Sequence, residues 1–362
     1  MIRWRTGTVS GVVGEWPGAR EIVVDVDGDG AVTALAYVAL VGAPEAGERV
    51  LLNTTALSLG LGTGGHALVV AIPDRLPPDP DGEPGRLMKA RYTPCQASVM
   101  GVDDQQSPHH ELIAAATSID ALPVVVADLH SALPAILAGV RADRPDARVA
   151  YVMTDGGALP LWYSRTVAGI SHLLCGTVTA GQAFGGDLES VTVHTALLAA
   201  KHVLRADVAI VAQGPGNLGT GTPWGFSGVA AGEAVNAVAA LRGAPIGALR
   251  ISGADPRERH RGVSHHTLTS FGRVALAAAD LPVPTGLSAE LDAAVRADLA
   301  PLAGRHRVLD IDSGGLLAAL AALPVALSTM GRSLSEDQAY FLAGAAAGRH
   351  AASRISSATS RR

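Results

Sequence analysis

The sequence predicts an α/β protein: a mainly parallel sheet flanked by helices, preceded by a small all-β, barrel-like N-terminal domain. Before Pro73, short runs that alternate apolar and polar residues are separated by Gly, Pro and Asp turns, at the spacing of a small antiparallel barrel. Beyond residue 86, apolar runs alternate with alanine-rich stretches, which is typical of parallel strands joined by crossover helices. The two patterns therefore predict two different domains in one chain.

Composition and turn residues set the expected domain boundaries. The chain has 362 residues, of which 48% are hydrophobic but only 4% aromatic, so we expect aliphatic cores. A stretch rich in proline, glycine and acidic residues separates the two patterns and predicts a linker. The expected parts are a barrel-like domain (1–72), a linker (73–86), an α/β domain (87–350) and a polar, flexible tail (351–362).

The runs assigned to strands and helices follow one another regularly. In the N-terminal domain the strand runs are "TGTVSGVV", "REIVVDV", "AVTALAYVAL", "ERVLLNTT" and "HALVVAI". In the α/β domain the expected strands are Val124–Asp128, Val149–Asp155, Gly176–Thr179, Val208–Gln213 and Ile246–Ser252. The expected helices are Ser131–Arg141, Leu161–Ile170, Leu188–Leu204, Val229–Leu241 and Gln338–His350. The small residues of the last helix allow close packing, either within the domain or across a symmetric interface, and we expect a homodimer.

Charge, cysteine usage and hydropathy exclude several classes of protein. The formal net charge is -5 and no block of Lys or Arg precedes the C-terminal tail, which argues against nucleic acid as a partner. The two cysteines lie far apart, which predicts neither a disulfide framework nor a CxxC zinc site. The N-terminus lacks the apolar region of a signal peptide, and the most apolar later segment, Leu316–Met330, is shorter than the ~20 residues that span a bilayer. We expect a cytoplasmic protein that binds a small molecule and no membrane.

Five polar or glycine-rich loops follow the expected strands. Ligands of parallel sheets bind beyond the carboxyl ends of the strands, where these loops converge if the strands are parallel. The loops are "DLHS" (128–131), "TDGG" (154–157), "AGQAFGGD" (180–187), "GPGNLGTGTPWGFSG" (214–228) and "GADPRERHRGVSHHT" (253–267). Their convergence predicts a small-molecule site at this edge of the sheet.

The fourth loop begins with the motif G-x-G-x-x-G, which matches the dinucleotide fingerprint. A dinucleotide site needs a helix that begins inside the motif and an acid at the tip of the next strand, and the sequence offers neither, because the next helix is expected only near Val229. The context of the motif therefore argues against NAD(P). The remaining alternatives are a nest of backbone N–H groups that binds an anion and a purely structural loop. The candidate anion-binding residues are Gly214, Gly216, Asn217, Gly219, Thr220 and Thr222.

Asp128, His130 and Asp155 stand at expected strand tips and are candidate catalytic residues, because a carboxylate there can orient a histidine or bind a metal. The alternatives are that Asp128 caps the following helix and that Asp155 is a turn residue. From the third loop, Gln182 and Asp187 are candidate substrate-binding residues. Asp187 is also placed to cap the helix expected after it.

His265 and His266 in the fifth loop are candidate catalytic residues as well. Adjacent side chains of an extended segment point to opposite sides, so we expect one of the two to face the site as a general acid or base. Arg259 is a candidate for holding an anionic group, and a solvated charged loop is the alternative. No set of three or four ligands with zinc-like spacing is found, although a divalent metal is left open as a cofactor. The segment Ser328–Asp337 could join the site from the far end of the chain, but we expect it to form a capping turn.

Motifs along nearly the whole chain resemble a bacterial family catalogued only as a domain of unknown function, number 3866. They are "LLNTTALSLGLGTGG", "MKARYTP", "VVVADLHSALPA", "AYVMTDGGALPL", "GQAFGGDLESVTVHT", "GPGNLGTGTPWGFSG" and "DPRERHRGVSHHT". The resemblance implies a bacterial, non-secreted protein and brings no activity with it.

The residues themselves favour an enzyme, a hydrolase or group transferase, that acts on a small anionic or phosphorylated molecule at the carboxyl edge of the sheet. The alternative from another class is a non-catalytic ligand sensor or scaffold. A nicotinamide-dependent oxidoreductase is a minor alternative that rests on the glycine motif alone.

Overall fold

The computed structural model describes residues 1–62, 64–79 and 85–355. Residues 80–84 of the expected linker and 356–362 of the expected tail lie outside the described residues. The chain forms two compact units, which we call the barrel unit and the sheet unit. The barrel unit comprises Met1–Pro84, Ala90–Ser98 and Trp162–Ala168, and the sheet unit comprises Gly85–Lys89, Val99–Leu161 and Gly169–Arg362. The barrel unit thus draws on three parts of the chain rather than on 1–72 alone.

The barrel unit contains a closed five-stranded barrel, as the alternating runs predict. Around the barrel the strands are β1 (Trp4–Trp16), β2 (Ala19–Val26), β3 (Gly30–Tyr37), β5 (Ala67–Ala71) and β4 (Arg49–Asn53). Alternate residues of β2, such as Ile22 and Val24, are fully buried in the barrel core. The pairing is antiparallel except between β3 and β5, which run parallel. Two one-turn helices, α1 (Val38–Val41) and α2 (Thr55–Ser58), connect the strands.

The sheet unit is built on an eight-stranded sheet in which every pair of neighbouring strands is parallel. Across the sheet the strands are β11 (Leu188–Glu189), β10 (Gly176–Thr179), β9 (Val149–Thr154), β12 (Val208–Gln213), β8 (Pro123–Val126), β13 (Ala244–Gly247), β16 (Asp280–Pro284) and β17 (Arg307–Ile311). The central strands β8 and β12 are buried throughout, which is why they are continuous apolar runs. The predicted α/β class is confirmed.

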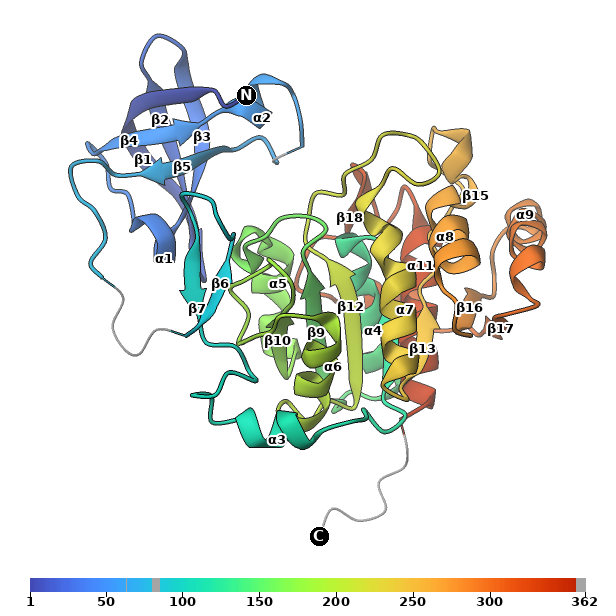
Figure 1. Ribbon diagram of the computed structural model, residues 1–362. Coiled ribbons are helices and arrows are strands. Elements are labelled where there is room, and N and C mark those ends of the chain that lie inside the picture. Colours follow the sequence, from blue (N-terminus) through green and yellow to red (C-terminus); the bar gives the residue numbers. More distant parts are fainter. Residues whose placement is uncertain (63, 80–84, 356–362) are drawn as a thin grey trace. The chain divides into compact units, whose positions relative to one another are not determined.

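Helices cover both faces of this sheet. The helices that follow the barrel strands along the chain are α3 (His110–Ala115), α4 (Leu133–Asp143), α5 (Arg165–Ile170), α6 (Val193–His202), α7 (Ala230–Ala240), α8 (His265–Thr269), α9 (Ala289–Leu299), α10 (Leu316–Ala321) and α11 (Gln338–Ser353). Figure 1 shows α6 and α7 in front of the sheet and α4 and α11 behind it. Among the described residues, no helix is long and apolar enough to cross a membrane.

Helices α4 and α11 pack unusually closely against each other. A Cβ atom on Gly139 of α4 would lie 1.9 Å from the carbonyl oxygen of Ala345, and one on Gly348 of α11 would lie 1.9 Å from that of Ile136. The small residues of the C-terminal helix therefore serve packing inside the sheet unit. A homodimer remains a prediction, but the small residues of α11 no longer support it, because they are used in packing against α4.

The order of the strands places a switch point between β8 and β12. These strands are neighbours in the sheet, yet the connection after β8 runs through α4 on one face and the connection after β12 runs through α7 on the other. Connections that diverge in this way leave a crevice at the carboxyl ends of the two strands. Asp128 and Gln213 stand at those ends.

Two predicted elements differ from the structure. The helix expected at Leu188–Leu204 begins only at Val193, because its first two residues form the edge strand β11. The strand expected at Ile246–Ser252 is divided: the chain leaves the main sheet after Gly247, and Ile251–Ser252 (β14) pairs with Gly262–Val263 (β15). Strands β16 and β17 were not predicted. The remaining short strands are β6 (Leu87–Lys89), β7 (Ala97–Val99), β18 (Ser328–Thr329) and β19 (Arg332–Ser333).

Candidate functional site

Buried polar atoms without a hydrogen-bond partner are concentrated at the carboxyl edge of the sheet. Such atoms are rare in folded proteins, since each one costs roughly 1–3 kcal/mol. In the described part of the chain eight side-chain atoms have this property, and five of them belong to residues at this edge. These five are Asp128 Oδ2, Gln213 Oε1, Arg250 Nη2, His265 Nε2 and His266 Nδ1.

Asp128 and Gln213 lie together at the switch point. The side-chain amide of Gln213 donates hydrogen bonds to the carbonyl oxygen of Asp128 and to Asn217 Oδ1, each at 2.8 Å. Both residues line a cavity of about 10 Å³, which has room for roughly one water molecule. Thr154, Ser227 and Gly228 also line it.

Asp128 as a whole residue is only 5% exposed. Burial raises its pKa above the ordinary value for aspartate, although the positive charge of Arg250 and the backbone N–H groups of Asp128 and Leu129 act in the opposite direction. A carboxyl group in such surroundings can hold and release a proton closer to neutral pH than a surface aspartate can.

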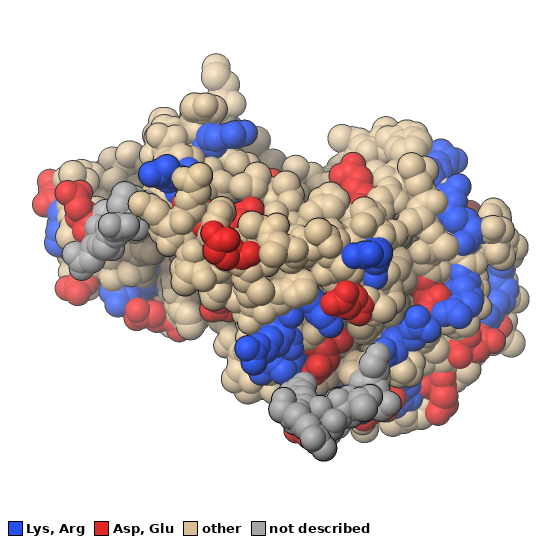
Figure 2. Space-filling model, turned by 60° about the horizontal axis from the view of Figure 1, so that its bottom comes forward, with Lys and Arg blue, Asp and Glu red and all other residues tan. Residues whose placement is uncertain are grey.

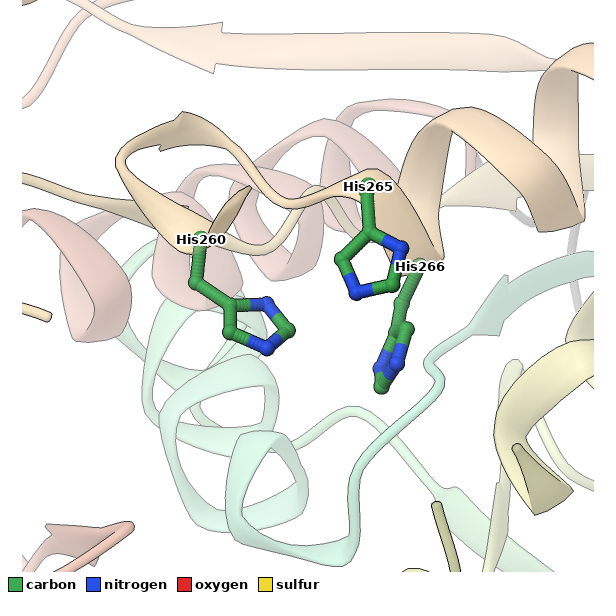
Figure 3. A group of neighbouring side chains, drawn as sticks. All are labelled: His260, His265 and His266. Carbon is green, nitrogen blue, oxygen red and sulfur yellow. The ribbon is translucent and has the colours of Figure 1, made fainter. Parts of the chain in front are cut away.

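Three histidines from the fifth loop form a cluster. His260 ends a single 3-10 turn, Glu258–His260, whereas His265 and His266 are the first two residues of α8. One ring nitrogen of each lies within 4.8 Å of those of the other two. Figure 3 shows the three rings converging on one space from these two elements.

The cluster corrects the expectation that His265 and His266 point to opposite sides. Ser264 caps α8 by accepting a hydrogen bond from the backbone N–H of His266 at 3.2 Å, so a helix begins where an extended segment was expected. Successive side chains of a helix are separated by about 100° instead of 180°. Both rings therefore reach the same space, with their centroids 4.3 Å apart.

Packing and hydrogen bonds fix two of the rings. The Nδ1 atom of His260 lies 2.7 Å from the hydroxyl of Ser264. The ring of His266 stacks on Phe226, with centroids 3.8 Å apart and planes inclined by 2°. Because Phe226 belongs to the glycine-rich loop, that loop contributes an aromatic wall to the cluster.

The surroundings of the cluster favour neutral imidazoles. Burial, followed by the positive charge of neighbouring residues that include Arg250 and Arg257, lowers the pKa of His260 and of His266 to about 3. The pKa of His265 is lowered for the same reasons, with Arg259 the largest charge effect. All three rings are therefore neutral at pH 7, which is the form of histidine that binds metal ions.

A buried network of ion pairs holds the loop that carries these histidines. Asp255 is fully buried, and Arg257 donates to both of its carboxylate oxygens at 2.9 Å. Arg332 donates to Asp255 at 3.1 Å and to Asp337 at 3.0 Å, and Arg250 lies 3.5 Å from Asp255. Although burial alone would raise the pKa of Asp255, Arg257 and Arg332 lower it. The segment 328–337 ends in a turn whose last residue, Asp337, is the N-cap of α11, and it also supports the site through Arg332.

The glycine-rich loop satisfies many of its own polar groups. The backbone N–H of Thr220 donates to Gly225 O at 2.7 Å, and the backbone N–H of Gly225 donates to Thr222 Oγ1 at 3.0 Å. The two threonine hydroxyls are 3.1 Å apart, and Gly219 forms a β-bridge with Phe226. The loop thus folds back on itself as a short hairpin.

The start of the same loop is shaped by close backbone contacts. A Cβ atom on Gly214 would lie 2.4 Å from Ala158 O, and Gly216 has a positive φ of +90°. Asn217 Oδ1 accepts hydrogen bonds from Ser227 Oγ at 3.1 Å and from the N–H of Gly228 at 3.3 Å. Helix α7 begins only at Ala230, so the glycine motif does not face a helix N-terminus as a dinucleotide site requires.

The other predicted residues lie in ordinary structural roles or at the surface. Asp155 is exposed and accepts a hydrogen bond from the backbone N–H of Gln182 at 2.8 Å. Asp187 accepts from the backbone N–H and the hydroxyl of Thr177, each at 2.8 Å, and it does not cap a helix. Thr192 caps α6 instead.

His130 and Arg259 differ in their surroundings. His130 Nδ1 lies 3.1 Å from the hydroxyl of Tyr151, and burial lowers its pKa to about 4 despite an opposing backbone hydrogen bond with Gln213. Arg259 is exposed on the turn that carries His260, and its charge acts on His265 and His266.

Sequence reasoning missed His260, Arg250, Phe226 and Lys89. His260 could have been found from the sequence, because the spacing H-x₄-H-H brings three imidazoles together once Ser264 is recognised as a helix cap. Lys89 is fully buried and donates to the carbonyl oxygens of Gly181, Ala183 and Ser190 at 2.8 to 2.9 Å, which anchors the third loop.

Together the sheet and the cluster define an α/β protein with a polar, partly unsatisfied site at the carboxyl edge of a parallel sheet. The chain belongs to the family described as Protein of unknown function (DUF3866), whose profile matches residues 33–348. No curated protein and no solved structure matches it significantly. The family confirms the resemblance seen in the sequence motifs and leaves the activity to be argued from the site.

Proposed function

We propose that the protein is an enzyme, a hydrolase or group transferase, that acts on a small anionic molecule at the carboxyl edge of the sheet. The observation that carries this proposal is the concentration there of buried polar atoms without partners. They come from separate loops: Asp128 after β8, Gln213 at the end of β12, Arg250 after β13, and the two histidines of α8.

Their energetic cost supports a role in binding. Five buried atoms without a hydrogen bond, of which only Arg250 Nη2 has a counter-ion, Asp255 at 3.5 Å, are expensive for a domain whose total stability is on the order of 5–15 kcal/mol. Proteins retain such local violations mainly at functional sites, where a ligand supplies the missing partners. Asp128 and Gln213 offer acceptors and Arg250 offers a donor, so a ligand with several polar atoms fits the set.

The charges near the histidines favour an anion. Arg250 and Arg257 act on all three neutral rings, and Arg259 acts on two of them from the surface. Asp255, the buried counter-ion, is shared among Arg250, Arg257 and Arg332. A phosphate or carboxylate group of a substrate would complete this balance, and a guanidinium group binds either one through paired hydrogen bonds.

The residue types favour hydrolysis or group transfer over redox chemistry. A buried carboxyl group and imidazole nitrogens provide proton donors and acceptors or metal ligands, which these reactions need. The glycine motif lacks the helix N-terminus that a nicotinamide dinucleotide requires.

A thermal-shift screen with phosphate esters, nucleotides and dicarboxylates tests the proposal. A ligand at 100 times its dissociation constant should add about 2.7 kcal/mol of stability. The Arg259→Ala variant should reduce the shift, whereas Arg144→Ala, which removes an exposed arginine after α4, should not. A shift that Arg259→Ala leaves unchanged, or the absence of any shift, would contradict the proposed site.

The same compounds separate catalysis from sensing. Each compound that binds is incubated with the protein, and the mixture is analysed for products by ³¹P NMR or mass spectrometry. We expect cleavage or transfer of the anionic group. Binding without turnover, under the conditions that support binding, would favour a ligand sensor instead.

A further inference from the structure

The three-histidine cluster has the composition of a metal centre. Each ring offers one nitrogen within 4.8 Å of the other two, and this is the one group of three such side chains found among the described residues. His265 Nε2 and His266 Nδ1 are buried without hydrogen-bond partners. His260 is 1% exposed and its Nδ1 lies beside Ser264 Oγ, so Nε2 is its available ligand atom. Imidazole nitrogens that converge in this way without hydrogen-bond partners can serve as ligands of one metal ion.

We propose that His260, His265 and His266 bind one divalent transition-metal ion, with zinc the best match. Three imidazoles suit zinc and its neighbours, whereas magnesium and calcium prefer oxygen ligands. Three protein ligands with a further position left for water or substrate are typical of catalytic zinc sites, while structural sites use four. The proposal deepens the proposed function by naming its cofactor, and it rests on that function for the role of the metal in turnover.

The geometry needs only a small adjustment to coordinate zinc. Zinc–nitrogen bonds of about 2.0–2.1 Å place tetrahedral ligand atoms roughly 3.4 Å apart. The nitrogens of the cluster are separated by up to 4.8 Å, and His265, the least buried of the three, can close the gap by rotating its ring. His266 is held by Phe226 and His260 by Ser264, so two ligands are already oriented.

Ser264 is a positioning residue for this centre. Its oxygen can accept hydrogen bonds both from the backbone N–H of His266 and from Nδ1–H of His260, which leaves the Nε2 lone pair of His260 directed to the metal. One side chain thus starts α8 and selects the tautomer of a ligand. Such outer partners typically change metal affinity about 10–100-fold.

The charge around the cluster indicates which kind of group would bind at the open position of the metal. Imidazole ligands are neutral and leave the full charge of the ion, and Arg257 and Arg259 stand on the same turn as His260 and add positive charge. The open position therefore favours an anion, such as hydroxide or the anionic group of a substrate. Zinc at such a position lowers the pKa of bound water to about 7, which supplies a nucleophile for hydrolysis at neutral pH.

Metal content measured on tag-free protein tests the proposal. The protein is stripped with a chelator, dialysed against zinc, and analysed by mass spectrometry for bound metal. We expect one zinc ion per chain in the wild type. His265→Ala and His266→Ala should lose stoichiometric zinc, and Ser264→Ala should weaken the affinity about 10–100-fold. His194→Ala, which removes an exposed histidine of α6, is the matched control and should bind as the wild type does.

Cobalt provides a second readout that does not depend on activity. Co²⁺ in a four-coordinate site with three imidazoles gives a strong visible absorption, which hexaaqua Co²⁺ lacks. We expect this spectrum in the wild type and in His194→Ala, and its loss in His265→Ala at unchanged circular dichroism. A wild-type protein without stoichiometric zinc, or variants that keep it, would overturn the proposal.

The outcomes also separate this proposal from the proposed function. Stoichiometric zinc without binding of any anionic compound would support the metal centre and contradict the proposed function. Turnover of a compound by chelator-treated protein, together with absent zinc binding, would support the function and overturn the metal centre.

Discussion

The two edges of the eight-stranded sheet differ in whether their charged and polar side chains have partners. At the amino edge lies a cavity of about 640 Å³, lined among others by Arg305, Arg307 and Asp280. Its central charges are paired, since Arg307 donates to both carboxylate oxygens of Asp280 at 2.8 and 2.6 Å and His350 lies 2.7 Å from the same group. Figure 2 looks towards the side where the strands begin and shows basic side chains beside acidic ones.

The carboxyl edge has a small cavity and polar atoms without partners, where the amino edge has a large cavity and paired charges. Its cavity at Asp128 has a volume of only about 10 Å³, but five buried side-chain atoms at this edge lack a hydrogen-bond partner. The comparison teaches that the volume of a cavity and its functional content are separate properties. A large cleft whose charges neutralise one another gives a ligand little to bind, whereas unpartnered buried groups are directed at a missing partner.

The largest effect is expected from breaking the ion-pair network under the histidine loop. Asp255→Ala leaves Arg250, Arg257 and Arg332 without their shared, fully buried counter-ion, and should destabilise the fold by about 3–5 kcal/mol. Urea unfolding measures this change. Asp310→Ala, which removes an exposed partner of Arg296, is the control, and a pair of this kind contributes about 0–1 kcal/mol. Equal losses in both variants would contradict the role assigned to Asp255.

A smaller effect, of opposite sign, is expected at Asp128. Because burial raises the pKa of this carboxyl group in the folded state, wild-type stability falls as the pH rises above about 4, the ordinary value for an unfolded aspartate. Asp128→Asn removes that dependence and should be more stable than the wild type at pH 7 by roughly 1–3 kcal/mol. The check is the difference in unfolding free energy from pH 4 to pH 8. A difference that does not grow with pH would argue against a buried, unpaired carboxylate.

At the amino edge the pH dependence should have the other sign. Burial raises the pKa of Asp280, but the hydrogen bonds and charges of Arg307 and His350 outweigh it, so the folded-state pKa is lowered. The stabilisation is then present above about pH 4 and is lost as the pH falls below it. Since Arg307 is 57% exposed, we expect Asp280→Asn to cost only about 1 kcal/mol at pH 7. Urea unfolding between pH 2 and 6 measures this change. The unfolding free energies of the wild type and Asp280→Asn should become equal at the acid end of this range.

The smallest effect is expected in the glycine-rich loop. The hydroxyl of Thr222 accepts a hydrogen bond from the backbone N–H of Gly225, so Thr222→Ala should change stability by no more than about 0.5 kcal/mol. If the loop contributes to the site only by stacking Phe226 on His266, Thr222→Ala should bind anionic compounds as the wild type does. Loss of binding in Thr222→Ala would restore the anion nest as the role of this loop.

Strands with a strong apolar signal were predictable to within two residues at each end. The range Val208–Gln213 matches β12, because a buried central strand leaves a continuous apolar run in the sequence. The range Gly176–Thr179 also matches β10, although that four-residue strand has no such run. The two-residue strand β11 and the early exit of the chain after Gly247 were not predictable, since so short a segment has no periodicity to detect.

The candidate site was predictable in its place but not in its arrangement. The rule for parallel sheets locates the edge, and His265 and His266 follow from it. Their convergence with His260 depends on one serine that starts a helix, and the contribution of Arg250 depends on contacts between segments that are distant in sequence. Contacts of that kind are set by tertiary packing, which a local pattern does not contain.

Hydrogen–deuterium exchange with a bound anionic compound tests the central claim most directly. The compound is the one with the largest thermal shift, and exchange is compared in its presence and absence. The account predicts protection in the segments 128–131, 213–228 and 250–266 at the carboxyl edge, with no change in 303–308 or 350–354 at the amino edge. Protection confined to the amino-edge segments would contradict it, because the ligand would then occupy the large cleft whose charges are already paired.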